Sequence, residues 1–362
     1  MKILQIWPSH SNSSWNTSFF LSRALRKAGV KTADFAYSQE IILQNLAINA
    51  FRGTKDKAYE GEAILLANRM MMGYVASALP DAIIVVTGLT MHKGTWQWLE
   101  DLRRQLRHPY KIILVYTESP YRPSEELELA QHADYIFTNE RAFVGRLRQF
   151  QPRSWYMPQA YDEEIHAPAA REQRYATYFC GSGFRTRIQV LEQIDWERAG
   201  GLTLKGLWRD IEEGSPLKPY YQEGLVQNEQ VVEDYRASGI CLNLHRREGE
   251  IVVFERDLPN SYSLERGVFK TADAESMNNR ACEIAATGAF QIADDSRAEL
   301  GEVFGDSVPQ FSVDEPAELQ ELVEFYTQRP QIRAKLAEDA RMRIQGRTYL
   351  ENVKRILSLM ED

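Results

Sequence analysis

The sequence is poor in cysteine and contains no long apolar run. The three cysteines, Cys180, Cys241 and Cys282, share no metal-ligand spacing, so we expect reduced, buried thiols. A membrane-spanning helix needs about 20 apolar residues, whereas the best apolar run is the five-residue stretch 82–86. The first eight residues are too short, and too soon interrupted by proline, to form a signal peptide. We therefore expect a cytoplasmic protein without a transmembrane segment.

The chain also lacks an excess of positive charge. Its 43 Lys and Arg against 51 Asp and Glu give a net charge of −8, which excludes an overall basic nucleic-acid-binding protein. The balance is +2 over residues 1–168 and −10 over the remainder, so an anionic partner would prefer the first half. The hydrophobic content of 44% and the length of 362 residues are those of an ordinary globular protein with two domains.

Short β-branched runs alternate with longer amphipathic stretches, which predicts parallel sheets covered by helices. Strands are expected at 2–7, 31–37, 82–88, 111–118, 135–139, 175–180, 202–208, 240–245 and 289–293, with a further short segment at 308–312. Helices are expected at 16–28, 60–78, 95–107, 140–150, 184–195, 228–237, 277–286, 315–328, 330–344 and 347–360. The pattern stops and prolines appear at about 158–170. The prediction is two doubly wound α/β domains facing each other across a cleft, with ligands at the carboxyl ends of strands.

A glycine turn follows the expected strand 175–180. Gly181, Ser182 and Gly183 lead into a helix that carries Arg185 and Arg187. Backbone N–H groups, a helix N-terminus and two guanidinium groups at one point would suit a phosphate. An ordinary strand-to-helix turn with solvated arginines fits the same segment.

Two glutamates eight residues apart flank the start of the expected helix 277–286. Glu275 would lie in the loop before the helix and Glu283 in its first turns. Surface carboxylates often have this spacing by chance, but apolar residues and Gly288 follow Glu283, and an unpaired carboxylate is costly there. Either a ligand hydroxyl or the neighbouring Arg280 would satisfy it.

Two histidines and one further acid lie near expected strand ends. His92 follows strand 82–88, where it could touch a sugar or an acceptor, although an ordinary loop histidine is the simpler interpretation. His245 ends a buried strand and could contact a diphosphate or pack in the core. Glu118 could orient an acceptor or pair with Arg122.

A basic patch is expected on the helix near 96–108, with further cations in the loop 52–57. Arg103, Arg104 and Arg107 together with two tryptophans make a nucleic-acid acceptor conceivable. Glu100 and Asp101 interrupt the patch, which favours a solvated helix face.

Several of these segments together resemble the CgeB-like group of retaining glycosyltransferases with the GT-B fold. The similarity covers roughly residues 110–355. It rests on the strand–Gly-Ser-Gly-x-Arg turn, the Glu-x7-Glu segment, and the segments 115–122, 133–139, 156–160 and 242–246, with Asn279 and Arg280 ahead of Glu283. Before residue 110 the likeness is only one of fold.

The resemblance implies a division into an acceptor-side domain over 1–165, a nucleotide-sugar-binding domain over 170–345, and a final helix over 346–362 that packs back on the first domain. It implies that Glu283 holds the ribose of the donor and that Glu275 faces the donor sugar. The remaining donor-binding residues would be Gly181, Ser182, Gly183, Arg187, His245, Asn279 and Arg280. His92 and Glu118 would join Glu275 in the catalytic set, and no metal or cofactor is expected.

The resemblance further implies a transferase that moves a sugar, with UDP-sugars favoured as donors, to an acceptor hydroxyl with retention of configuration. The acceptor could be a glycan, a protein or a phage-type hydroxymethylated DNA base. The sequence departs from the family pattern in two places: the N-terminal loop 8–14 lacks a glycine-rich turn, and the segment 247–274 is interpreted as an inserted loop. Two alternatives remain: a sugar-nucleotide epimerase of the same fold, and a non-catalytic nucleotide-binding protein.

Overall fold

The computed structural model describes residues 1–8, 12–53, 60–88, 91–107, 109–117, 119, 121, 123–208, 211–224, 226–247 and 274–361. The chain divides into two compact units. Of the described residues, the first unit contains those of 1–157 and 353–361, and the second contains those of 158–247 and 274–352.

A parallel six-stranded sheet forms the centre of the first unit. Its order is β2-β1-β3-β4-β5-β6, so the chain reverses its direction across the sheet between β1 and β3. The strands are β1 (Lys2–Trp7), β2 (Lys31–Ala36), β3 (Ala82–Val86), β4 (Lys111–Tyr116), β5 (Tyr135–Thr138) and β6 (Ser154–Tyr156). All five residues of β3 are buried, as expected for a strand covered by helices on both faces.

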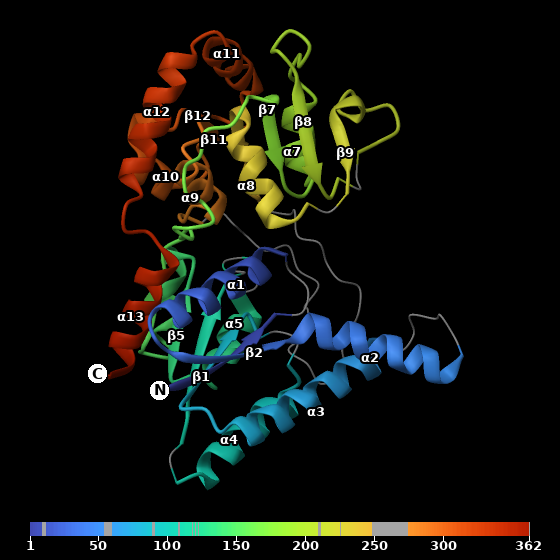
Figure 1. Ribbon diagram of the computed structural model, residues 1–362, viewed down its shortest axis with the longest axis vertical. Helices are drawn as coiled ribbons and strands as arrows, with labels where there is room; N and C mark the ends of the chain where they lie inside the picture. The colour runs from blue at the N-terminus through green and yellow to red at the C-terminus, as the bar shows by residue number, and fades with distance from the viewer. Residues whose placement is uncertain are drawn as a thin grey trace. The chain divides into compact units, whose positions relative to one another are not determined.

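The helices of the first unit connect these strands (Figure 1). They are α1 (Asn12–Lys27), α2 (Tyr37–Arg52), α3 (Glu60–Ala78), α4 (Lys93–Gln105), α5 (Pro123–Ala130), the 3-10 turn η2 (Arg141–Phe143) and α6 (Val144–Leu147). Helices α2 and α3 lie side by side, and their inner faces, including Ile41, Ile48 and Ile64, belong to the core of this unit. Two consecutive helices therefore occupy the connection from β2 to β3.

The second unit has the strand order β12-β11-β10-β7-β8-β9, again parallel throughout. The strands are β7 (Tyr175–Cys180), β8 (Leu202–Gly206), β9 (Tyr221–Glu223), β10 (Ser238–Asn243), β11 (Gln291–Asp294) and β12 (Gln310–Phe311). In sequence order this is the doubly wound dinucleotide-fold order, in which the chain reverses between the first and fourth strands. Here these strands are β7 and β10, so the ends of both border the crevice that this topology provides.

The helices of the second unit complete its layers. They are α7 (Arg185–Leu191), η3 (Lys218–Tyr220), α8 (Asn228–Arg236), α9 (Asn279–Ala286), α10 (Ala298–Phe304), η4 (Gly305–Ser307), α11 (Pro316–Thr327) and α12 (Pro330–Arg343). The last helix, α13 (Tyr349–Glu361), begins in the second unit, and its residues from Val353 onward belong to the first.

The predicted fold class is confirmed: two parallel sheets surrounded by helices. The sequence pattern missed β6 and β9 because each is a three-residue edge strand, too short for any periodicity. It also missed α2, α5 and α10. Helix α2 follows β2 without an intervening residue and is apolar on nearly every face, so its periodicity is weak.

Gly206 provides a test of this packing. Its φ of +107° lies in the region that favours glycine, and a Cβ there would lie 2.2 Å from the Gly181 carbonyl oxygen. Gly206→Ala should therefore lower the free energy of unfolding by about 2 kcal/mol or more, as measured by urea denaturation. Gly214→Ala is the matched control, because a Cβ at Gly214 meets nothing within 4 Å. Equal stabilities for the two variants would contradict the described approach of β8 to the glycine turn.

Candidate functional site

The Gly181–Gly183 turn follows β7 at the point where the sheet of the second unit reverses. The Gly181 N–H donates to the Lys205 carbonyl at 3.0 Å and the Gly183 N–H donates to the Leu207 carbonyl at 2.7 Å. These two N–H groups are therefore used within the fold, and the expectation that they are free to bind a phosphate is wrong. They fasten the turn to the end of β8 instead.

Both glycines are needed for close packing. A Cβ at Gly181 would lie 2.7 Å from Nη2 of Arg280, and one at Gly183 would lie 2.4 Å from the ring of Trp208. The absence of a side chain at Gly181 thus allows the Arg280 guanidinium to approach the turn.

Three guanidinium groups gather at this turn around two phenyl rings. Arg187 lies 5.4 Å from the ring centre of Phe179 and 4.9 Å from that of Phe184. Arg280 lies 4.8 Å from Phe179, and Arg246 lies 4.7 Å from Phe184. Each contact is at cation–π distance. The sequence pointed to Arg187 and Arg280, but it missed Arg246 as a site residue, although this arginine directly follows His245.

Arg187 fixes the relative position of two loops. Its side chain is 7% exposed, and it donates to the carbonyl oxygens of Ser182 at 2.8 Å and Leu244 at 2.6 Å. The guanidinium therefore ties the glycine turn to the end of β10, where Arg246 lies. Its positive charge remains within the site.

Glu283 is buried on α9, as the sequence predicted. Its side chain is 6% exposed, and Oε1 accepts a hydrogen bond from the Asn279 amide at 2.9 Å. Burial raises the pKa of Glu283 to about 7, although the charge of Arg280 and the hydrogen bond from Asn279 both lower it. Close to neutral pH this carboxyl group can thus be either protonated or ionised.

Glu275 lies in the loop before α9 and its side chain is exposed. Glu299 holds the backbone of this loop at two points. The N–H of Glu299 donates to the Glu275 carbonyl at 3.0 Å, and the carboxylate of Glu299 accepts from the Met277 N–H at 3.1 Å. Arg347 in turn pairs with Glu299 at 2.9 Å. The fold therefore fixes the backbone from which the Glu275 carboxylate projects.

His245 is buried behind the same loop. Its Nδ1 lies 3.1 Å from Oδ2 of Asp294, and its Nε2 accepts the N–H of Asn278 at 3.3 Å. Burial lowers the pKa of His245, in agreement with a neutral ring whose Nε2 is an acceptor. Burial would raise the pKa of Asp294, but its interactions with His245 and Ser296 outweigh this and lower it. His245 therefore positions the start of α9.

Asn278 completes this arrangement at the N-cap of α9. Its side-chain oxygen accepts the N–H of Ala281 at 3.1 Å, and its amide donates to Asn243 at 2.7 Å. The residues that the sequence singled out in the second unit are thus brought together around the start of α9 and the glycine turn.

The two remaining catalytic candidates lie in the sequence of the first unit. His92 is partly buried at the N-cap of α4, its N–H donates to Asn68 at 3.0 Å, and burial lowers the pKa of its imidazole. Glu118 lies outside the described residues. Their assignment to the acceptor side stays a prediction.

The basic patch on α4 is largely neutralised. Arg103 pairs with Asp134 at 2.7 Å, and Arg104 lies 3.2 Å from Asp101 and 3.5 Å from Glu100. Trp96 is fully buried. This face therefore has the character of a solvated helix surface with a core tryptophan.

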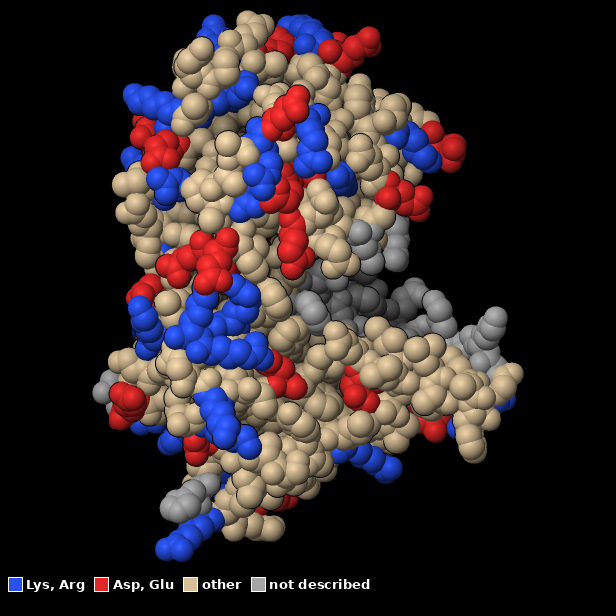
Figure 2. Space-filling model, viewed as in Figure 1, with Lys and Arg blue, Asp and Glu red and all other residues tan. Residues whose placement is uncertain are grey.

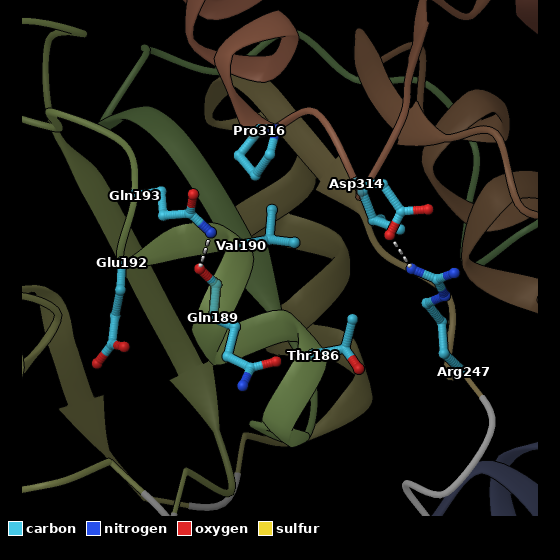
Figure 3. Close-up of a pocket in the computed structure, with 9 residues that line it drawn as sticks. Thr186, Gln189, Val190, Glu192, Gln193, Arg247, Asp314 and Pro316 are labelled. Atoms are coloured by element: carbon cyan, nitrogen blue, oxygen red, sulfur yellow. Dashed lines mark hydrogen bonds and ion pairs between the residues drawn. The ribbon is translucent and has the colours of Figure 1, made fainter.

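A pocket on the second unit lies against the outer face of α7 (Figure 3). It is lined by Thr186, Gln189, Val190, Glu192, Gln193, Arg247, Val313, Asp314 and Pro316. Arg247 and Asp314 form an ion pair of 3.1 Å at one side of it. None of the predicted site residues lines this pocket.

Within the described part of the chain, His, Cys, Asp and Glu side chains form no group of three or more that could hold a metal ion. The same residues include no helix of sufficient length and hydropathy to cross a membrane.

The two Rossmann-like sheets of this chain match those of solved GT-B glycosyltransferases. The sucrose-phosphate synthase of Thermosynechococcus elongatus superposes with a TM-score of 0.62 and 13% identity, over 99% of this chain and 98% of that one. An α-glucosyltransferase in complex with UDP and a 13-mer DNA gives a TM-score of 0.63 and 12% identity, over 100% of both chains. HepE of Anabaena, in complex with UDP-glucose, gives 0.61 and 11%, over 100% of this chain and 99% of that one.

The sequence itself identifies the family. Residues 163–358, more than half of the chain, match the glycosyl transferase-like family, and the protein belongs to it. A comparison with curated protein sequences finds no significant match. The matched region includes the glycine turn and both glutamates.

The raised pKa of Glu283 predicts a pH-dependent stability. Between pH 4.5 and about 7 the folded protein binds more protons at this carboxyl than the unfolded chain, so its contribution to stability falls as pH rises. Glu283→Gln stays neutral at every pH. Its free energy of unfolding relative to wild type should therefore rise by roughly 2–3 kcal/mol when the pH is raised from 5 to 8. Urea denaturation at both pH values measures this gain. Glu213→Gln, at a side chain 97% exposed, is the control. If the free energy of unfolding of Glu283→Gln differed from that of wild type by the same amount at both pH values, the raised pKa of Glu283 would be contradicted.

Proposed function

We propose that this protein is a glycosyltransferase that moves a sugar from a UDP-sugar to an acceptor hydroxyl with retention of configuration. The observation that carries the proposal is the convergence of three guanidinium groups and a buried carboxylate at the reversal point of the second sheet. A nucleotide sugar needs cations for its diphosphate and an acceptor of hydrogen bonds for its ribose. Both lie here within one turn and one helix start.

Glu283 is the proposed ribose-binding group. A carboxylate accepts hydrogen bonds at both oxygens, so it can hold two vicinal hydroxyls. Oε1 is held by Asn279 at 2.9 Å, which orients the group without neutralising it. Hydroxyl donors would replace part of the hydration that burial removes from the ionised carboxylate.

Arg280 and Arg246 are the proposed direct partners of the diphosphate, and Arg187 adds charge from behind the glycine turn. Negative charge grows on the diphosphate as the bond to the sugar breaks, and preplaced cations stabilise that charge. The α-glucosyltransferase and HepE were solved with UDP and UDP-glucose respectively, which supports UDP as the nucleotide here.

Glu275 is proposed to face hydroxyls of the donor sugar. It is exposed in a loop whose backbone is fixed, and we assign it no role as a covalent nucleophile.

In the proposed reaction the acceptor oxygen attacks the anomeric carbon on the side from which the diphosphate leaves, and the leaving phosphate takes the acceptor's proton. The acceptor is a hydroxyl of a glycan, a protein or a hydroxymethylated DNA base, with His92 and Glu118 proposed on its side. The paired arginines of α4 do not favour DNA over the other two.

Donor binding tests the proposed ribose contact. Glu283→Ala should weaken UDP-glucose binding roughly 10-fold or more, since a hydrogen bond to a charged group contributes about 1.5–3 kcal/mol. Isothermal titration calorimetry measures the affinity, and Glu213→Ala is the surface control. Arg280→Ala should weaken UDP binding more than uridine binding. Unchanged affinity for UDP-glucose in Glu283→Ala would remove the ribose assignment.

Turnover tests the reaction. With a UDP-sugar and a hydroxyl acceptor, NMR of the product should show the anomeric configuration of the donor, and excess chelator should leave the rate unchanged. Glu275→Gln should lower kcat while UDP affinity is kept, because the side chain is placed at the sugar and not at the nucleotide. Inverted product would contradict retention. A free monosaccharide and UDP, formed without acceptor, would favour the epimerase, and binding without turnover of any donor would favour a nucleotide-binding protein.

A further inference from the structure

The outer face of α2 in the first unit is apolar and exposed. Ile42, Leu43 and Leu46 are 59%, 58% and 61% exposed, and Phe51 is 95% exposed. Helical spacing places Ala47 and Ala50, which are also exposed, on the same side. These six residues form the α2 face. The opposite side of α2, with Ile41 and Ile48, is buried in the core of the unit.

The size of the α2 face matches an interface. Its four large side chains and two alanines present on the order of 500 Å² of apolar surface. A stable protein–protein interface buries about 800 Å² on each partner, of which roughly two thirds is apolar in homodimers. The α2 face alone therefore provides the apolar area that one side of a dimer requires.

The charges around the face do not favour a lipid surface. Between Glu40 and Arg52 the helix has no charged residue, and the surface over α2 in Figure 2 is largely uncharged. The whole segment 37–79 has four basic and four acidic residues. Helices that lie on membranes usually carry an excess of Lys and Arg for anionic headgroups. A neutral face can instead meet a copy of itself without like-charge repulsion.

Large and small side chains follow one another along the face. The large side chains Ile42, Leu43 and Leu46 come first along the helix, the small Ala47 and Ala50 follow, and Phe51 ends the face. Two copies of α2 packed antiparallel about a two-fold axis near Leu46 would place Ile42 against Ala50 of the second copy, and the reverse. The sizes of these side chains are therefore complementary in one arrangement, and the uncharged stretch 41–51 adds no repulsion.

We propose that the protein forms a homodimer through antiparallel contact of the two α2 faces. The interface is isologous, with Leu46 of both copies at the axis. This inference rests on the first unit alone and is independent of the proposed glycosyl transfer.

Sedimentation velocity tests the dimer. The 362-residue protein should sediment as a species of twice its monomer mass of 41.7 kDa. Leu46→Glu places two like charges together at the axis and should weaken association about 100-fold or more, giving a monomer. Leu65→Glu is the matched control, because Leu65 is an exposed leucine of α3, 40% exposed, and outside the α2 face. It should leave the dimer intact. Circular dichroism should show that both variants keep the helix content of wild type.

Cysteine cross-linking tests the register in the same protein. Leu46→Cys should oxidise to a covalent dimer on a non-reducing gel, whereas Leu65→Cys should not. A wild-type protein that sediments as a monomer would overturn the proposal, as would a Leu46→Glu variant that dimerises as tightly as Leu65→Glu. A monomer that cosediments with phosphatidylcholine vesicles, and loses this binding in Leu46→Glu, would assign the α2 face to lipid and would overturn the dimer.

Discussion

The burial of one carboxylate beside one guanidinium at the start of α9 is the interaction on which the site of the second unit depends. Glu283 loses most of its hydration, which Asn279 and the nearby charge of Arg280 compensate in part. An apolar residue there would stabilise the fold more, so the carboxyl has a cost that a ligand hydroxyl can offset. The preceding loop is fixed from behind by His245 and Asp294, which leaves the start of α9 little freedom to relax.

The glycine turn and α9 act as one assembly because Arg280 connects them. Its guanidinium comes close to Gly181 and lies over Phe179, so it packs the helix start against the turn after β7. Arg187 joins the same turn to the end of β10 through carbonyl oxygens. The positions of the cations are therefore set by the packing of the sheet, which is the preorganisation that charge stabilisation requires. Each of these contacts lies within the second unit.

Much of the fold could be predicted because buried parallel strands have a plain signature. The run 82–86 could form only a covered strand, and β7 with its glycine turn was found for the same reason. The placement of Glu283 on α9 followed from the apolar residues after it. The direction of single hydrogen bonds could not be predicted: the N–H groups of Gly181 and Gly183 bind carbonyls near β8, which are distant in sequence. The role of His245 depended likewise on Asp294, 49 residues away.

Proton exchange during donor binding tests the central claim most directly. UDP-glucose has no group that titrates near neutral pH, so any proton released on binding comes from the protein. Because burial raises the pKa of Glu283 to about 7 and ribose hydroxyls favour its ionised form, binding at a pH somewhat below 7 should release a proton. Calorimetry in buffers of different ionisation enthalpy should show this release in wild type and its loss in Glu283→Gln. Binding without proton release, or release that persists in Glu283→Gln, would contradict the account.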